Sequence, residues 1–282
     1  MSLPELISAY NEYLSYIDTY DSKNNIIDLS NAKFFYPTTL LPLIIFIQNK
    51  KCGYKEPKDP YVSFYIKRII DSRDTINTTS QGSYIPPIQL PVKEEYFDPE
   101  GIIDNISNYL REWVSRIHNI LFYIISELSN NIYQHASCSL AYIMAQRYDR
   151  RRFVELSIID NGITIRGSLS KKIRVDSDSE AIISALKGYS SKEEKGRGYG
   201  LSTSIRNLTE VLNGEVLIVS GTGLLYLHKR RGFRCDNNNL NRRLDGTLIS
   251  TRVSLHVNSN NIELSQIYEK HINLSNYNIC NI

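Results

Sequence analysis

The sequence has few of the residues by which several specialised protein classes are recognised. Its 282 residues include four cysteines, two methionines and one tryptophan. The cysteines, Cys52, Cys138, Cys235 and Cys280, lie far apart and form no CxxC pair or Cys/His cluster. We therefore expect neither a structural zinc site nor a disulfide framework.

Long apolar runs and targeting signals are also lacking. The longest apolar run, residues 40–47, contains Pro42 and is much shorter than the roughly 20 residues that cross a bilayer. No basic region precedes an apolar stretch at the N-terminus, so we expect no signal peptide, no membrane association and a cytoplasmic location. The chain is 41% hydrophobic and 22% charged, which is typical of a globular protein.

The excess of positive charge is small. A formal net charge of +3 predicts no overall attraction to nucleic acid. Basic residues nevertheless gather at residues 147–152 and 229–243. Each cluster fits either a solvated loop or a patch for nucleic acid or an acidic partner.

Residues 82–99 are rich in proline, which predicts a domain boundary near residue 92. Before it, strand and helix candidates alternate as in a small α/β domain: helices at 4–20 and 38–47, strands at 26–29 and 61–66. After it we expect helices at 102–135, 180–186 and 201–212, and strands at 140–148, 153–159, 215–219, 224–228 and 247–257. The predicted fold class is α+β, with helices covering one face of a mixed sheet.

The first candidate motif lies on the long helical stretch. Glu127, Asn131 and His135 are spaced four residues apart and share one stripe of a helix. An amide oxygen can bind Mg²⁺, and a carboxylate can orient or deprotonate a nucleophile. Alone, the pattern is a weak signal, and a polar helix face with a solvated histidine explains it better.

The second and third motifs are rich in glycine. Asp160 ends an apolar strand two residues before Gly162, where a carboxylate could accept a hydrogen bond from an amine such as that of adenine; a simple Asx turn is the alternative. Gly196, Gly198 and Gly200 precede a predicted helix and fit a phosphate cradle or a flexible loop. Neither a Walker motif nor a dinucleotide fingerprint is present.

The three motifs in this order resemble the GHKL superfamily of gyrase, heat-shock chaperone, histidine kinase and mismatch-repair ATPases. The likeness is greatest to the histidine kinase and anti-sigma-factor kinase branch. It implies a two-layer α/β sandwich of the Bergerat type at residues 93–258, ATP and Mg²⁺ as cofactors, and an ATP lid at residues 166–195. Thr164 stands where the family often has a second glycine, so we expect a differently shaped loop beside the nucleoside.

The resemblance also assigns roles to single residues. Glu127 would be the catalytic general base, and Asn131 the Mg²⁺ ligand. The other residues that would bind the nucleotide are His135, Asp160, Gly162, Gly196, Gly198, Gly200, Leu201 and Thr247.

Within residues 1–92, the segment NIIDLSNAKFFYPTTLLPLIIFI (residues 25–47) more weakly resembles the strand-turn-helix of the STAS family of anti-sigma-factor antagonists. Thr38 lies near the position that is phosphorylated in that family. The resulting hypothesis is a regulatory ATPase or protein serine/threonine kinase of the partner-switching kind. Its partners would be a regulatory protein and, as an option, a second copy of the chain. Two alternatives stay open: an ATP-dependent clamp on nucleic acid, and a nucleotide-binding module without turnover. Residues 259–282 form a tail with no predicted role.

Overall fold

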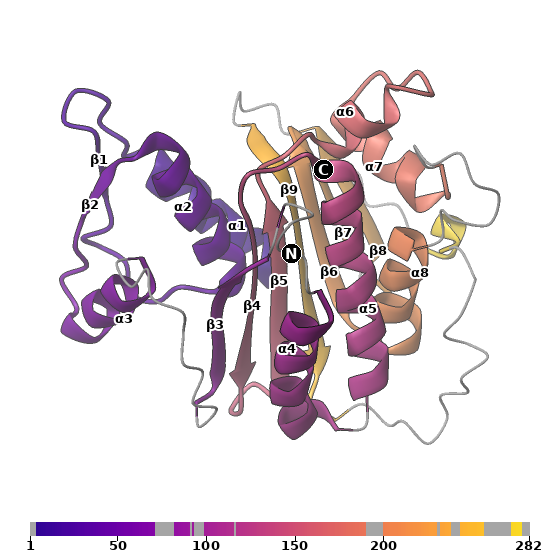
Figure 1. The fold of residues 1–282 in the computed structure, drawn as a ribbon, viewed down its shortest axis with the longest axis horizontal. Helices are drawn as coiled ribbons and strands as arrows, with labels where there is room; N and C mark the ends of the chain where they lie inside the picture. Colours follow the sequence, from indigo (N-terminus) through magenta and orange to yellow (C-terminus); the bar gives the residue numbers. More distant parts are fainter. Residues whose placement is uncertain are drawn as a thin grey trace.

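A seven-stranded sheet between two layers of helices forms the centre of the molecule (Figure 1). The structure, a computed structural model, describes residues 4–70, 82–90, 92, 99–115, 117–189, 200–229, 232–237, 243–256 and 272–277. Within these ranges, none of the helices is long and apolar enough to cross a membrane.

The strands run in the order β3-β4-β5-β9-β6-β7-β8. Their bounds are Tyr84–Gln89 (β3), Ala141–Tyr148 (β4), Phe153–Asp160 (β5), Glu215–Gly221 (β6), Gly223–His228 (β7), Gly232–Asn237 (β8) and Leu244–Ser254 (β9). Every neighbouring pair is antiparallel, so the prediction of a mixed sheet was wrong. Short hairpins connect β4 to β5, β6 to β7 and β7 to β8, and such connections impose antiparallel pairing.

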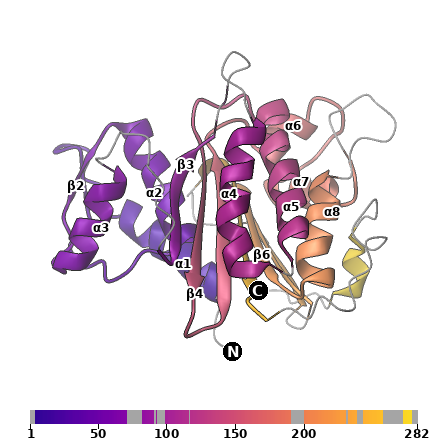
Figure 2. The same cartoon turned by 60° about the horizontal axis from the view of Figure 1, so that its bottom comes forward.

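The helices between residues 99 and 211 cover one face of the sheet, as predicted (Figure 2). They are α4 (Pro99–Val114), α5 (His118–Asn131), α6 (Ile165–Leu169), α7 (Asp178–Leu186) and α8 (Gly200–Arg206), with π-helical turns η2 (Ile132–Ala136) and η3 (Asn207–Val211). The single helical stretch predicted at 102–135 is therefore two helices followed by a π turn. The buried His118 ring ties them together, because its Nε2 lies 2.9 Å from the Ser107 carbonyl oxygen.

The N-terminal helices cover the opposite face. Helices α1 (Glu5–Ile17) and α2 (Pro37–Lys50) confirm the two predicted there, and strand β1 (Ile26–Asp28) confirms the first strand. Strand β1 pairs in parallel with β2 (Gly53–Lys55). Helix α2 is buried on nearly all sides, since it lies between α1 and the sheet. The STAS-like character of this segment stays a prediction.

Residues 61–66, predicted as a strand, belong to helix α3 (Pro60–Ile70). The Asp59 carboxylate accepts hydrogen bonds from the backbone N–H groups of Tyr61 and Val62, so it caps a helix whose first residue is proline. Ser63 and Ile66 are buried at a helical spacing, whereas Tyr61 and Phe64 are exposed. The aromatic and β-branched residues suggested a strand, and the Asp-Pro start was the signal that opposed it.

Strand β3 was not predicted, because it contains Pro86 and Pro87. Among the described strands it pairs only with β4, at the edge of the sheet, where a proline disrupts no second ladder. The register shifts between Ile85 and Ile88, so the two prolines occupy an irregularity. The strand lies before residue 92 and yet extends the central sheet.

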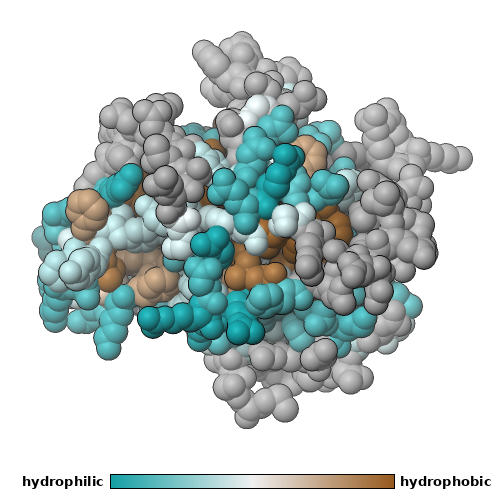
Figure 3. Space-filling view, turned by 90° about the horizontal axis from the view of Figure 1, so that it is seen from below, coloured by the Kyte–Doolittle hydropathy of each residue, from teal (hydrophilic) through white to brown (hydrophobic). Residues whose placement is uncertain are grey.

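Both faces of the sheet are buried. Along β4, Tyr142 and Met144 belong to the core beneath the N-terminal helices, whereas Ala141, Ile143 and Ala145 belong to the core beneath α4 and α5. The predicted sandwich of sheet and helices thus gains a third layer. In the view from below, hydrophilic residues surround smaller apolar areas (Figure 3).

Candidate functional site

Helices α5 and α8 bring three of the predicted residues together. Glu127 and Asn131 lie on the last turns of α5, and Gly200 begins α8, which packs against α5. A Cβ atom on Gly200 would overlap the Glu127 carboxylate and lie 3.8 Å from Asn131 Nδ2. A side chain at this position would therefore displace the Glu127 carboxylate from the place it occupies here.

The Asn131 side chain has unused hydrogen-bonding capacity. Its Nδ2 atom is buried and has no hydrogen-bond partner among the described residues. A buried donor without a partner costs free energy, so a group that fills this site would relieve the cost. His135 follows in the π turn η2, and its side chain lies outside the described residues.

Gly196 and Gly198 also lie outside the described residues. Of the predicted glycine box, the structure describes Gly200 and the half-buried Leu201, which packs against the cores around α7 and α8. Among the described residues, no group of three or more His, Cys, Asp or Glu side chains could hold a metal ion.

Asp160 ends the central strand β5 and is almost fully buried, with 4% of its surface exposed. Its carboxylate accepts hydrogen bonds from the backbone N–H groups of Gly162, at 2.8 Å, and Thr247. Burial raises the pKa of this carboxyl group to about 7, although both hydrogen bonds lower it. Burial and the nearby Asp160 raise the pKa of Cys138 to about 11.

Thr247 lies beside Asp160, since the two residues are paired between β5 and β9. The Thr247 hydroxyl is 2.9 Å from that of Ser220, whose oxygen accepts the backbone N–H of Ile165. The preceding Gly246 has a φ of +90°, and a Cβ there would overlap the Asp160 carbonyl oxygen. Sequence reasoning found Thr247 and missed Ser220.

In the loop after Asp160, Thr164 stands where the family often has a second glycine and directly precedes the short helix α6. The Thr164 hydroxyl accepts a hydrogen bond from the backbone N–H of Gly167 at 3.1 Å, so it caps the short helix α6. That this loop has a different shape beside the nucleoside stays a prediction.

Asn161 connects this end of the sheet to the N-terminal layer. Its side-chain oxygen accepts the backbone N–H groups of Ser139 and Leu140, and its Nδ2 donates to Asn49 Oδ1 at 3.1 Å. The end of α2 is therefore linked to the residue that directly follows Asp160.

The clusters around Glu127 and Asp160 both lie in a part of the chain that matches a known protein family. Residues 117–255 match the family model described as histidine kinase-, DNA gyrase B- and HSP90-like ATPase. An HATPase_c domain is found here. The HATPase_c domain includes strands β4–β9 and every predicted site residue from Glu127 to Thr247. No curated protein and no solved structure matches the chain.

The HATPase_c domain points to ATP binding and to a regulatory ATPase or kinase. The N-terminal helices lie outside the matched residues. Besides the apolar core beneath them, these helices contact the domain through a polar cluster that sequence reasoning missed.

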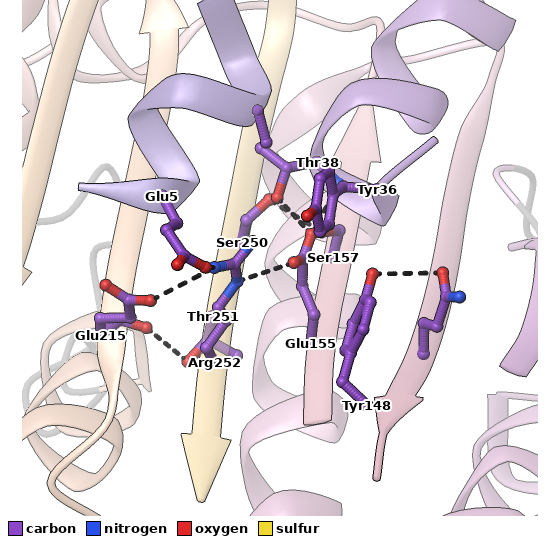
Figure 4. Close-up of polar contacts among 12 residues, drawn as sticks. Glu5, Tyr36, Thr38, Tyr148, Glu155, Ser157, Glu215, Ser250, Thr251 and Arg252 are labelled. Carbon is purple, nitrogen blue, oxygen red and sulfur yellow. Dashed lines mark hydrogen bonds and ion pairs between the residues drawn. The ribbon is translucent and has the colours of Figure 1, made fainter. Parts of the chain in front are cut away.

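This cluster is centred on Arg252 of β9 (Figure 4). The Arg252 side chain is 4% exposed; its Nε donates to Glu155 Oε2 at 2.8 Å, and its Nη1 donates to the Glu5 carboxylate. A carboxylate oxygen of Glu215 lies 3.9 Å from the same Nη1. The guanidinium group lies 4.7 Å from the centre of the Phe153 ring.

The fully buried Glu155 carboxylate also caps helix α2. Its Oε1 accepts the backbone N–H of Thr38 at 3.0 Å and the Thr38 hydroxyl at 2.7 Å. Negative charge at a helix N-terminus is favourable, because the first N–H groups of a helix have no partners within it. Thr38 itself is fully buried, so its hydroxyl is covered in this arrangement.

Proposed function

We propose that the HATPase_c domain binds ATP with Mg²⁺ between the Asp160 and Glu127 clusters, and that the chain is a partner-switching regulatory ATPase or protein serine/threonine kinase. The observation that carries this proposal is the buried Asp160 carboxylate at the end of the central strand. Its hydrogen bonds among the described residues come from backbone N–H groups, and it has no cationic partner there.

Asp160 suits an adenine ring. A carboxylate held by two backbone N–H groups keeps further lone pairs, which can accept the exocyclic amine of the base. The adjacent Thr247 and Ser220 hydroxyls can exchange hydrogen bonds with the ring nitrogens or with bridging water. Burial excludes bulk water, which strengthens each of these bonds.

The other cluster suits the phosphates. Mg²⁺ is usually bound by one or two protein oxygens together with phosphates and water, so the single Asn131 amide oxygen is a sufficient protein ligand. The part of the chain that the structure describes contains no cluster of three or more acidic, His or Cys side chains that could hold the ion without phosphates. When bound, the ion neutralises the phosphate charge. Glu127 would orient or deprotonate the nucleophile, which is either water or a hydroxyl group of the partner protein.

The structure weighs against a clamp that grips nucleic acid with residues 147–152. Arg147 pairs with Asp149 at 3.0 Å and lies over the Trp113 ring. Arg151 pairs with Glu5 at 3.1 Å. Two of the four arginines are thus engaged within the chain.

The proposal is tested by isothermal titration of the full chain with ATP and Mg²⁺. We expect a dissociation constant in the micromolar range, roughly −8 kcal/mol or weaker. If binding is found, phosphate release and phosphate transfer to partner hydroxyls are measured next, because they distinguish an ATPase from a kinase. The absence of binding to the intact chain would refute the proposal.

Glu127→Ala is expected to leave ATP affinity within about threefold and to lower turnover by roughly 100-fold or more, as for loss of a general base. The measurement pairs titration calorimetry with phosphate release. Ser126→Ala is the matched control, since this neighbouring hydroxyl donates to the Phe122 carbonyl oxygen of its own helix. Full turnover in Glu127→Ala would remove Glu127 from the catalytic role.

ATP affinity should rise with pH, because the amine of adenine requires an ionised Asp160. With a pKa of about 7, the ionised fraction and hence the affinity rise about tenfold between pH 6 and pH 8. Cys138 faces the same carboxyl group and stays neutral in this range, since its pKa is about 11. Titrations at several pH values measure the effect, and a flat profile would contradict it.

The free energy of unfolding should fall as the pH rises, whereas ATP affinity rises. The folded-state pKa of Asp160 is raised above its ordinary value of 3.8, so folding favours the protonated form. Its contribution to the free energy of unfolding is fully present below about pH 4 and is lost as the pH rises to about 7. Chemical unfolding of the nucleotide-free protein over this pH range measures the contribution of Asp160. The Asp160→Asn variant, which does not titrate at this position, is the reference.

A further inference from the structure

The C-terminal segment at residues 272–277 returns to helix α8. In Figures 1 and 2 its short 3₁₀ turn η6 (Leu274–Asn276) lies beside α8. Ile272 and Tyr277 are buried in the same core as α5 and α8, and Leu274 packs against that core. The segment is therefore part of the layer that carries Glu127, Asn131 and Gly200.

Ser202 connects this segment to the start of α8. It is fully buried, two positions after Gly200. Its hydroxyl donates to the carbonyl oxygen of Leu186, the last residue of α7, at 2.6 Å. Its oxygen accepts the backbone N–H of Ile272 at 3.1 Å. One hydroxyl group thus joins the end of α7, the first turn of α8 and the C-terminal segment.

Tyr277 connects the C-terminal segment to the π turn that follows α8. Its phenol oxygen is 2.7 Å from the hydroxyl of Thr209, which lies in the π turn η3 that continues α8. Thr209 is fully buried and also bonds to the Ile205 carbonyl oxygen at 2.9 Å. The two contacts hold α8 and its π-helical extension at both ends.

The position of α8 matters because Gly200 lies directly against the Glu127 and Asn131 side chains of α5. Even a Cβ atom at Gly200 would overlap the Glu127 carboxylate. A small shift of α8 would therefore change the spacing among Gly200, Glu127 and Asn131. The base-binding residues would be spared, since Asp160 and Thr247 lie on strands β5 and β9.

We infer that residues 272–277 act as a brace that sets the position of α8 against α5, with Ser202 and Tyr277 as positioning residues for the phosphate end of the site. This inference rests on the proposed function. The brace acts on the interactions made by the outer phosphates of ATP and leaves those made by the adenosine part unchanged.

The test compares ATP with AMP, each with Mg²⁺, by titration calorimetry of the full chain. Ser202→Ala removes both hydroxyl contacts and is expected to weaken ATP binding about tenfold, while AMP binding changes less than twofold. Tyr277→Phe removes only the phenol oxygen and is expected to act in the same direction. The matched control is Ser157→Ala, which removes a buried hydroxyl 2.8 Å from that of Ser250 within the sheet.

Each outcome decides the inference. A lower ATP-to-AMP affinity ratio in the Ser202 and Tyr277 variants, with the ratio unchanged in Ser157→Ala, supports the brace. Equal weakening of both nucleotides, or lower melting temperatures with an unchanged ratio, reduces the segment to a general stabilising role and overturns it. If Ser202→Ala does not fold, Tyr277→Phe alone decides. A wild-type chain that binds neither nucleotide refutes the proposed function, and the inference falls with it.

Discussion

Arg252→Met should lower the free energy of unfolding by about 3–5 kcal/mol, the usual cost of removing one partner from a buried ion pair. Methionine preserves most of the apolar stem and removes the charge. Glu155, which is 0% exposed, would then be left buried with Thr38 alone. The uncompensated carboxylate has to be either desolvated or protonated, and both cost free energy.

Arg151→Met is the matched control for this prediction. Arg151 pairs with the same Glu5 carboxylate at 3.1 Å, but its side chain is 47% exposed. Because exposed pairs contribute little, its loss should cost less than about 1 kcal/mol. Urea unfolding of both variants gives the comparison. Similar losses in the two would show that burial does not set the strength of the Arg252 cluster.

Asp160→Asn should abolish nucleotide binding, with a loss of affinity of at least roughly 100-fold. The backbone N–H groups of Gly162 and Thr247 require an acceptor, so they will orient the new side-chain oxygen toward themselves. The amide NH₂ group would then face the exocyclic amine of adenine. Two donors cannot pair, and both would stay buried without partners.

This loss should occur without unfolding. At pH 8 the wild-type carboxylate carries a buried charge, since its pKa is about 7. The neutral amide removes that cost, so the melting temperature of Asp160→Asn should equal or exceed that of the wild type. Asp149→Asn, on the exposed β4–β5 turn, is the control and should bind ATP normally. Unchanged ATP affinity in Asp160→Asn would refute the assignment of the base site.

Much of the HATPase_c domain could be predicted because its signals are local. The apolar stripe of α5 and the short, mostly apolar segments of β4 and β5 indicate the type of each element within a few residues. Strand β3 was not predicted because proline generally disfavours strands. Its place at the edge of the sheet, where proline is tolerated, is visible only in the folded structure. The prediction at α3 was wrong because its aromatic and β-branched residues favour a strand, although Asp59 and Pro60 are typical of a helix start.

In the candidate site, too, local motifs could be predicted from the sequence and contacts between distant residues could not. Asp160 and Gly162, or Glu127 and Asn131, are neighbours in the sequence, so their motifs were visible. The cluster around Arg252 was not, because Glu5 and Glu155 lie 247 and 97 positions from it. Its local signs were weak, because Glu155 and Arg252 lie in strands that contain other polar residues as well. The contacts of Ser202 with Ile272 depend on tertiary packing and had no sequence signal.

The helical layer formed by α1 and α2 has a practical consequence for any shortened form of the protein. A fragment limited to residues 117–255 would uncover the apolar sheet side chains beneath those helices, among them Tyr142, Met144, Leu217 and Tyr226. It would also leave Glu155 and Arg252 facing solvent without Thr38 and Glu5. Large exposed apolar patches favour aggregation. We therefore expect a fragment to need the N-terminal helices, which precede the residues that match the family, to keep this face of the sheet covered.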